Sequence, residues 1–290
     1  MLYLLLSIIC ATSLFVVLRS YERWQIKDSH GITFNYIFCV LIGLFFSGDL
    51  SLFKAVGQSS IFYFVICLGI GFILVFFLIA KTTIVSGVLT ASIAMKLSFV
   101  IPVSLAIILY NDKISTLKIL GILCAIIAVV LIAFEKNKEA LSNTNQTNQR
   151  EKIILPLIVF IGSGLCDATF NYIQKNMQDE SWSHPITTLV FASACVTGIF
   201  INVRDKKLYQ WKNVLGGLAL GIPNYFSLYF LMKTLDTMKW ESSVIFPVNN
   251  LGVVGLSAFA GILLFQERIT MQKMLGFIFA VTSILIFVFI

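Results

Sequence analysis

Two charged side chains lie deep inside apolar stretches of the sequence. Lys96 is midway along the stretch 83–110, and Asp167 lies past the middle of the stretch 153–173. A charge at the centre of a lipid bilayer costs about 2.5–3.5 kcal/mol on insertion scales, so such residues normally face a bundle interior or a wet cavity. We therefore predict that both line one central cavity. The alternatives are a snorkelling side chain for Lys96 and a structural hydrogen bond between helices for Asp167.

Amide side chains form a second group of candidates. Five asparagines lie inside apolar stretches: Asn35, Asn171, Asn224, Asn249 and Asn250. Pro223 precedes one of them and Pro247 lies two residues before another. A proline removes a backbone donor and leaves the carbonyl one turn earlier without its partner. Such interrupted helices are where transporters build binding sites, so we predict broken helices there, whereas Asn35 is interpreted as an interhelical hydrogen-bonding residue.

These considerations give a set of candidate solute-binding residues. They are Lys96, Asp167, Asn171, Asn224, Tyr225, Asn249 and Asn250. Tyr225 enters as an amphipathic wall beside the asparagines. His30 and His184 sit at the entrances of apolar stretches without a carboxylate beside them, and we assign them no catalytic role.

The composition indicates the environment in which these residues must lie. Of the 290 residues, 58% are hydrophobic and 12% are charged, and the mean hydropathy is +0.93. An average soluble domain carries about 25% charged residues, so this chain has too few polar side chains to coat a soluble fold. The net charge of +7 comes from residues between apolar stretches. That distribution suits anionic lipid headgroups rather than nucleic acid. Nothing in the sequence, including its six cysteines, indicates a metal or cofactor.

Apolar stretches long enough to cross a bilayer can be counted directly, and there are ten. They are 2–18, 32–47, 60–80, 83–110, 117–134, 153–173, 186–203, 213–232, 242–265 and 274–290. Each should be helical, because lipid offers no partner to backbone N–H and C=O groups. The sequence therefore predicts an all-α, multi-pass membrane protein.

The two halves of the sequence resemble each other. At a shift of 155 residues, Asp112–Ser115 falls on Glu267–Thr270, and Gly121 falls on Gly276. Matched polar residues in loops are not expected from chance similarity of apolar segments. We predict a five-helix repeat in 1–135, a polar linker in 136–152 and a second repeat in 153–290. Because five is odd, the second repeat would enter the membrane inverted, as in secondary transporters that bind substrate between their repeats.

The sequence also resembles a known family, the drug/metabolite transporter superfamily, in particular its ten-helix EamA-like members. The resemblance rests on Phe265–Thr270 with Gly276, and on the first-half counterpart, which has Asp112 where the family usually has Glu. Gly221–Tyr225 and Phe246–Asn250 resemble a subgroup signature. The resemblance implies a secondary transporter, not an enzyme. It implies export of a small organic metabolite or drug-like solute across a cell membrane, with the bacterial inner membrane favoured.

Two other functions remain open at this point. A membrane-embedded enzyme acting on a lipid or isoprenoid would need clustered carboxylates, histidines or a nucleophile–base pair, and no such cluster occurs in the sequence. A sensor or scaffold would need a soluble domain for its output. A phosphate-binding loop for ATP is absent as well.

Charge also bears on orientation and on coupling. Connections after odd-numbered spans carry 14 Lys and Arg residues, and those after even-numbered spans carry 6. The positive-inside rule then places both termini outside the cell. For coupling, we predict that an anionic substrate group competes for Lys96 and frees Asp167 to take a proton, which makes protons the candidate coupling ion.

Overall fold

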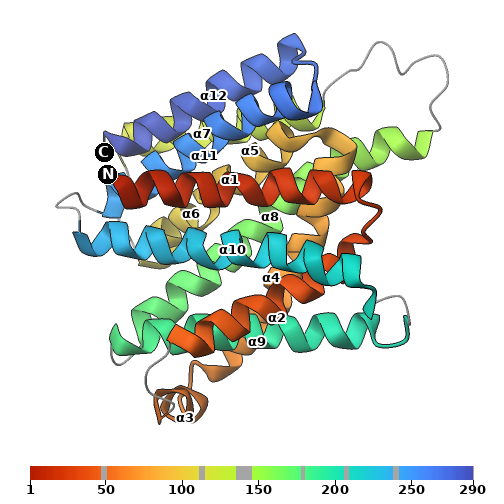
Figure 1. Ribbon diagram of the computed structural model, residues 1–290. Helices are drawn as coiled ribbons and strands as arrows, with labels where there is room; N and C mark the ends of the chain where they lie inside the picture. Colours follow the sequence, from red (N-terminus) through yellow and green to blue (C-terminus); the bar gives the residue numbers. More distant parts are fainter. Residues whose placement is uncertain are drawn as a thin grey trace.

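The computed structural model is a bundle of long helices (Figure 1). It describes residues 1–46, 51–110, 115–134, 146–177, 180–205, 209–237 and 242–289. Within these ranges, ten helical stretches are long and apolar enough to cross a membrane. The predicted all-α, multi-pass membrane protein is thus confirmed, and each of the ten stretches overlaps one predicted span.

The helices follow one another along the chain. Their bounds are α1 Leu2–Arg23, α2 Asp28–Phe46, α3 Ser51–Gly57, α4 Phe62–Ser86, α5 Val88–Leu97, α6 Val100–Tyr110, α7 Thr116–Ala133, α8 Gln146–Asn176, α9 Ser183–Asn202, α10 Trp211–Thr237, α11 Ser242–Phe265 and α12 Met271–Val288, with a 3₁₀ turn at Glu180–Trp182. Helices α5 and α6 together make the fourth span. Most of the predicted linker lies outside the described residues, but its end, from Gln146, is already helical and continues into α8.

The start of the fourth span differs from the prediction. The sequence placed the boundary at Lys81 and Thr82, but α4 runs through both and ends at Ser86. Gly87, with φ +96°, separates α4 from α5 in a backbone conformation that other residues rarely adopt. The helix can continue through Lys81, because the Lys81 ammonium is paired with Glu151 Oε1 at 2.8 Å and so is not left uncompensated in lipid.

The predicted helix breaks at Pro223 and Pro247 are wrong, since both prolines lie inside continuous helices, α10 and α11. Long transmembrane helices tolerate proline because neighbouring groups satisfy the freed carbonyl. A break among the described residues occurs instead at Ser98, between α5 and α6. Pro102 lacks the N–H that would bond the Ser98 carbonyl, and this carbonyl accepts from the Ile101 N–H at 2.9 Å.

Helices of the first half interleave with helices of the second. α2 packs against α9 and α10, α4 against α8 and α9, α1 against α10 and α11, and α7 against α12. Both termini lie at one end of the bundle, which we call the termini end (Figure 1). The α1–α2, α4–α5, α9–α10 and α11–α12 connections lie at the other end, which we call the loop end.

Backbones of α2 and α10 approach closely at Gly217. A Cβ at this position would lie 2.8 Å from the Phe34 carbonyl carbon and 2.9 Å from the Asn35 nitrogen, closer than real Cβ contacts allow. Small residues of this kind let transmembrane helices pack tightly where no hydrophobic force drives them together. Gly217 therefore joins the second half to the first.

We expect Gly217→Val to destabilise the protein, because the added side chain must push α2 and α10 apart. Overpacking of this kind costs about 1–3 kcal/mol, so the melting temperature of the purified protein in detergent should fall by several degrees. Gly255→Val on α11 is the control, since a Cβ there meets nothing within 4 Å. Equal melting temperatures for the two variants would contradict the close α2–α10 contact.

Candidate functional site: a central cavity

A cavity of about 920 Å³ lies between the two halves of the bundle. At the termini end its lining reaches the ends of spans, at Gln174 on α8 and His184 on α9. Toward the loop end it stops at Phe15 on α1 and Ile79 on α4, about two helical turns before those helices finish. The cavity is therefore reached from the termini end and closed at the loop end.

All seven predicted site residues line this one cavity. They are Lys96, Asp167, Asn171, Asn224, Tyr225, Asn249 and Asn250. They come from α5, α8, α10 and α11, so both halves of the chain contribute. Asp167 and Asn171 are four residues apart on α8 and share one face of the helix. Their role in binding a solute stays a prediction.

Lys96 and Asp167 share the cavity without forming an ion pair with each other or with any other described residue. Ser98 Oγ lies 2.9 Å from the Asp167 carboxylate and 2.6 Å from the Met95 carbonyl, so its one proton is shared between these two acceptors, and the structural alternative for Asp167 also has support. Ser98 stands at the α5–α6 break. No hydrogen bond to the Lys96 ammonium comes from the described part of the chain, and the cavity thus holds an available cation and a partly satisfied anion.

The amide of Asn224 is positioned by a second amide on the neighbouring helix. Asn224 Nδ2 donates to Asn35 Oδ1 at 3.1 Å, which joins α10 to α2. The interpretation of Asn35 as an interhelical hydrogen-bonding residue is confirmed. Asn35 itself is buried, and its Nδ2 has no partner among the described residues. This unsatisfied donor belongs to the residue that pairs with the cavity-lining Asn224, and it lies beside the cavity rather than in its lining.

The two asparagines of α11 are held differently. Ser7 Oγ lies 2.9 Å from the Ser227 carbonyl and 3.1 Å from Asn249 Oδ1, so its one proton is shared between these two acceptors. Asn250 Nδ2 lies 3.5 Å from the Lys96 carbonyl, a long contact that links α11 to α5. Asn171 makes no hydrogen bond within the described ranges and is exposed to the cavity.

Aromatic side chains form much of the remaining wall, and Tyr225 is the one among them that was predicted from sequence. The others are Phe15, Tyr36, Phe72, Phe76, Phe99, Phe170, Phe191, Tyr229, Phe246 and Phe287. The Tyr225 ring stacks on Phe46 with centroids 6.2 Å apart. The chain contains 26 phenylalanines, and a Phe that faces lipid looks the same in sequence as one that faces a cavity. Only the packing of the helices separates them.

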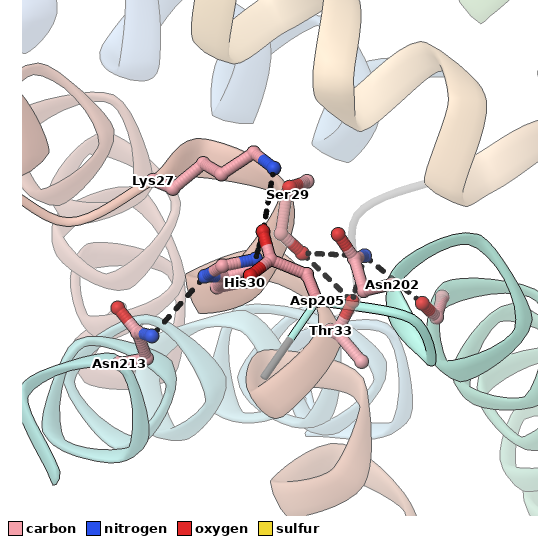
Figure 2. A network of polar contacts seen from close by, with 8 residues as sticks. Lys27, Ser29, His30, Thr33, Asn202, Asp205 and Asn213 are labelled. Atoms are coloured by element: carbon pink, nitrogen blue, oxygen red, sulfur yellow. Dashed lines mark hydrogen bonds and ion pairs between the residues drawn. The ribbon is translucent and has the colours of Figure 1, made fainter. Parts of the chain in front are cut away.

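A polar network closes the loop end between the start of α2, the end of α9 and the start of α10 (Figure 2). Asp205 Oδ2 lies 3.1 Å from His30 Nε2 and 3.0 Å from the Lys27 ammonium. Asn213 Nδ2 is 3.2 Å from His30 Nδ1, which fits a neutral imidazole that donates from Nε2. Asn202 donates to the hydroxyl of Thr33 at 3.1 Å. The carboxylate partner of His30 was missed from sequence because it lies 175 residues away.

Comparison with known proteins supports the fold over the whole chain and names no activity. No family model matches the sequence. An uncharacterized protein of Haemophilus influenzae is 27% identical over 289 residues, which cover 97% of this chain and 95% of that protein. A solved crystal structure superposes with a TM-score of 0.59 at 10% identity, over 97% of this chain and 95% of the other. At that identity the likeness shows the fold alone.

The cavity predicts different reactivities for two native cysteines. Cys166 lines the cavity, whereas Cys39 is fully buried. In proteins that keep only one of these cysteines, a water-soluble maleimide should label Cys166 readily and Cys39 only after denaturation. Labelling is read by the mass increase of the protein. Equal labelling of both, or no labelling of Cys166 in the folded protein, would contradict a water-accessible cavity.

Proposed function

We propose that the chain is a secondary transporter that moves a small organic metabolite or drug-like solute across the membrane. The observation that carries this proposal is the single cavity shared by the two halves, which is reached from one end and closed at the other. A binding site of this kind, near the middle of a bundle built from both halves, is typical of transporters that work by alternating access. The aromatic wall and the polar residues within it suit an organic solute better than an inorganic ion.

Two helix caps support an internal repeat. Ser115 caps α7 by accepting from the Lys118 N–H at 3.2 Å, and Thr270 caps α12 by accepting from the Lys273 N–H at 3.3 Å. Thr270 lies 155 residues after Ser115, and Lys273 lies 155 residues after Lys118, which is the shift of the sequence repeat. The same local structure therefore starts the fifth span of both halves.

The packing of the helices also supports the repeat and its inversion. Exchanging the halves replaces each span by the corresponding span of the other half, five places along the chain. The α2–α10 contact then becomes α9–α4, and the α1–α10 contact becomes α8–α4. Likewise α1–α11 becomes α8 against the fourth span, while α7–α12 and α2–α9 map onto themselves. All of these contacts are present. Inverted halves of equal build could close either end of the cavity with matching contacts, which is the basis of alternating access.

The proposed orientation makes this an outward-facing conformation. Because the loop end carries the excess of Lys and Arg, the positive-inside rule puts it in the cytoplasm. The cavity then opens to the outside, which is where an exporter in the bacterial inner membrane would release its solute. Proton coupling would use Lys96 and Asp167: an anionic group of the solute binds Lys96, and Asp167 carries the proton.

The function is tested in two steps. Metabolites are first compared without a target list in cells with and without the gene. Candidate solutes are then tested for counterflow in proteoliposomes, where excess unlabelled solute inside drives accumulation of labelled solute. A transporter accumulates the unchanged solute, whereas a membrane-embedded enzyme would convert it. Chemical conversion without accumulation would overturn the proposal.

Asn224→Leu should abolish counterflow while the protein reaches the membrane at nearly normal abundance. The substitution keeps the side-chain size but removes the amide that faces the cavity and pairs with Asn35. Counterflow and membrane abundance are measured on the same samples. Ser227→Ala, on the same helix one turn away, is the control and should retain most counterflow. Full counterflow in Asn224→Leu would make this amide a packing residue only.

Asp167→Asn should remove the response of transport to a pH gradient while counterflow, which needs no net proton movement, continues. The amide keeps an acceptor for Ser98 but cannot exchange a proton. Uptake is measured with and without an imposed gradient. If uptake by Asp167→Asn still follows the gradient, proton coupling through this residue is wrong.

Exchange of the charges at Lys96 and Asp167 gives a separate test. Lys96→Asp and Asp167→Lys should each abolish transport, since each gives these two positions the same charge. If the cation and anion act as a pair, the double variant should regain transport above either single variant. If it does not, Lys96 anchors the solute at a fixed place, independently of Asp167.

A further inference from the structure

The junction between α4 and α5, at the loop end, is held by two charged side chains from the other half of the chain. Glu267, in the α11–α12 connection, accepts from the Val88 N–H through Oε1 at 2.7 Å. Lys273, near the start of α12, donates from Nζ to the Ser86 carbonyl at 3.2 Å. Both contacts cross between the halves and flank Gly87.

The signs of these charges match the helix ends that they contact. Ser86 is the last residue of α4, and Val88 is the first of α5. The final carbonyls of a helix carry partial negative charge and its first N–H groups partial positive charge. The lysine therefore stabilises the end of α4, and the glutamate stabilises the start of α5. Each also satisfies a backbone group that the helix leaves without a partner.

Two glycines allow the Glu267 carboxylate to come this close. A Cβ at Gly87 would lie 2.7 Å from Glu267 Oε2, and a Cβ at Gly261 would lie 2.8 Å from the same atom. The Glu267 N–H also donates to the Gly261 carbonyl at 3.0 Å, and the preceding Gln266 has φ +52°. The backbone is thus shaped to deliver this carboxylate to the start of α5.

We propose that Glu267 and Lys273 form a clamp on Gly87 that holds the loop end of the cavity closed, and that release of this clamp opens the cavity to that end. The proposal rests on the transport function proposed above. Three observations carry it: both contacts join opposite halves, both lie beyond the closed floor of the cavity, and the residue between them is the one described glycine with positive φ.

The clamp is connected to the site through a single helix. Lys96 lies on α5, nine residues after Gly87, which corresponds to about 13 Å along the helix. A tilt of α5 about Gly87 therefore moves Lys96 together with the Val88 N–H. Helices move as rigid elements about hinge residues. A solute that binds Lys96 and changes the tilt of α5 therefore also strengthens or weakens the contact between the Val88 N–H and Glu267.

The clamp can be tested by labelling Cys166 from each end of the bundle. The other five cysteines are replaced by alanine, and a membrane-impermeant maleimide is applied to sealed vesicles of both orientations. We expect Glu267→Ala to raise the labelling rate from the loop end about fivefold, the population shift expected from losing one helix cap of ordinary strength. Glu22→Ala is the control for loss of an acid at the same end, because exposed Glu22 pairs with Arg19 on its own helix, and Arg19 keeps its own hydrogen bond to the Ile84 carbonyl of α4 at 2.8 Å.

Further variants separate the clamp from a general loss of structure. Glu267→Gln keeps an oxygen acceptor without the charge, so its labelling rate should fall between wild type and Glu267→Ala. Gly87→Ala, with strained φ and a clash against the carboxylate, should behave like Glu267→Ala, whereas Gly57→Ala meets nothing within 4 Å. Labelling from the loop end that is the same in wild type, Glu267→Ala and Glu267→Gln would overturn the clamp. Labelling requires no solute. If the Glu267 variants change the labelling rate but the protein moves no solute, the clamp stands and only the transport function is refuted.

Discussion

The constraint on which this structure depends is the high cost of an unpartnered polar group in hydrocarbon. Lipid offers no hydrogen bonds, so each backbone group of the ten spans must be satisfied inside its own helix or by a neighbour. Charged side chains face the same requirement. Lys96 and Asp167 meet it by facing a cavity, and Glu267 and Lys273 meet it by binding helix ends.

The same constraint divides the polar residues between two places. At the loop end, polar groups of the two halves bind one another, as in the contact of His30 with Asp205 (Figure 2). In the cavity, the side chains of Lys96 and Asn171 have no hydrogen-bonding partner among the described residues. Groups that are fully paired hold a conformation, and groups that lack partners are available to a ligand. The proposed transport function follows from this division.

Much of the fold could be predicted from sequence, because a transmembrane helix is a local pattern of about 20 apolar residues. The cavity residues could be named for the same reason: a charge or amide within such a stretch is costly wherever the helix lies. Long-range and backbone features could not. The contact between His30 and Asp205 joins residues 175 positions apart. The break falls at Ser98, four residues before Pro102, whereas α10 and α11 continue through Pro223 and Pro247, so the presence of a proline alone did not locate it.

Transport by alternating access requires that the two ends of the cavity open in turn. Spin-label distances measured across each end of the reconstituted protein report this motion. The labels can be placed at exposed positions, with Glu22 and Arg204 as the pair at the loop end and Gln58 and Thr237 as the pair at the termini end. We expect each pair to show two distance populations that shift in opposite directions when pH or solute changes, so that the loop end widens as the termini end narrows. A single distance distribution at both ends, unchanged by solute and pH, would contradict it.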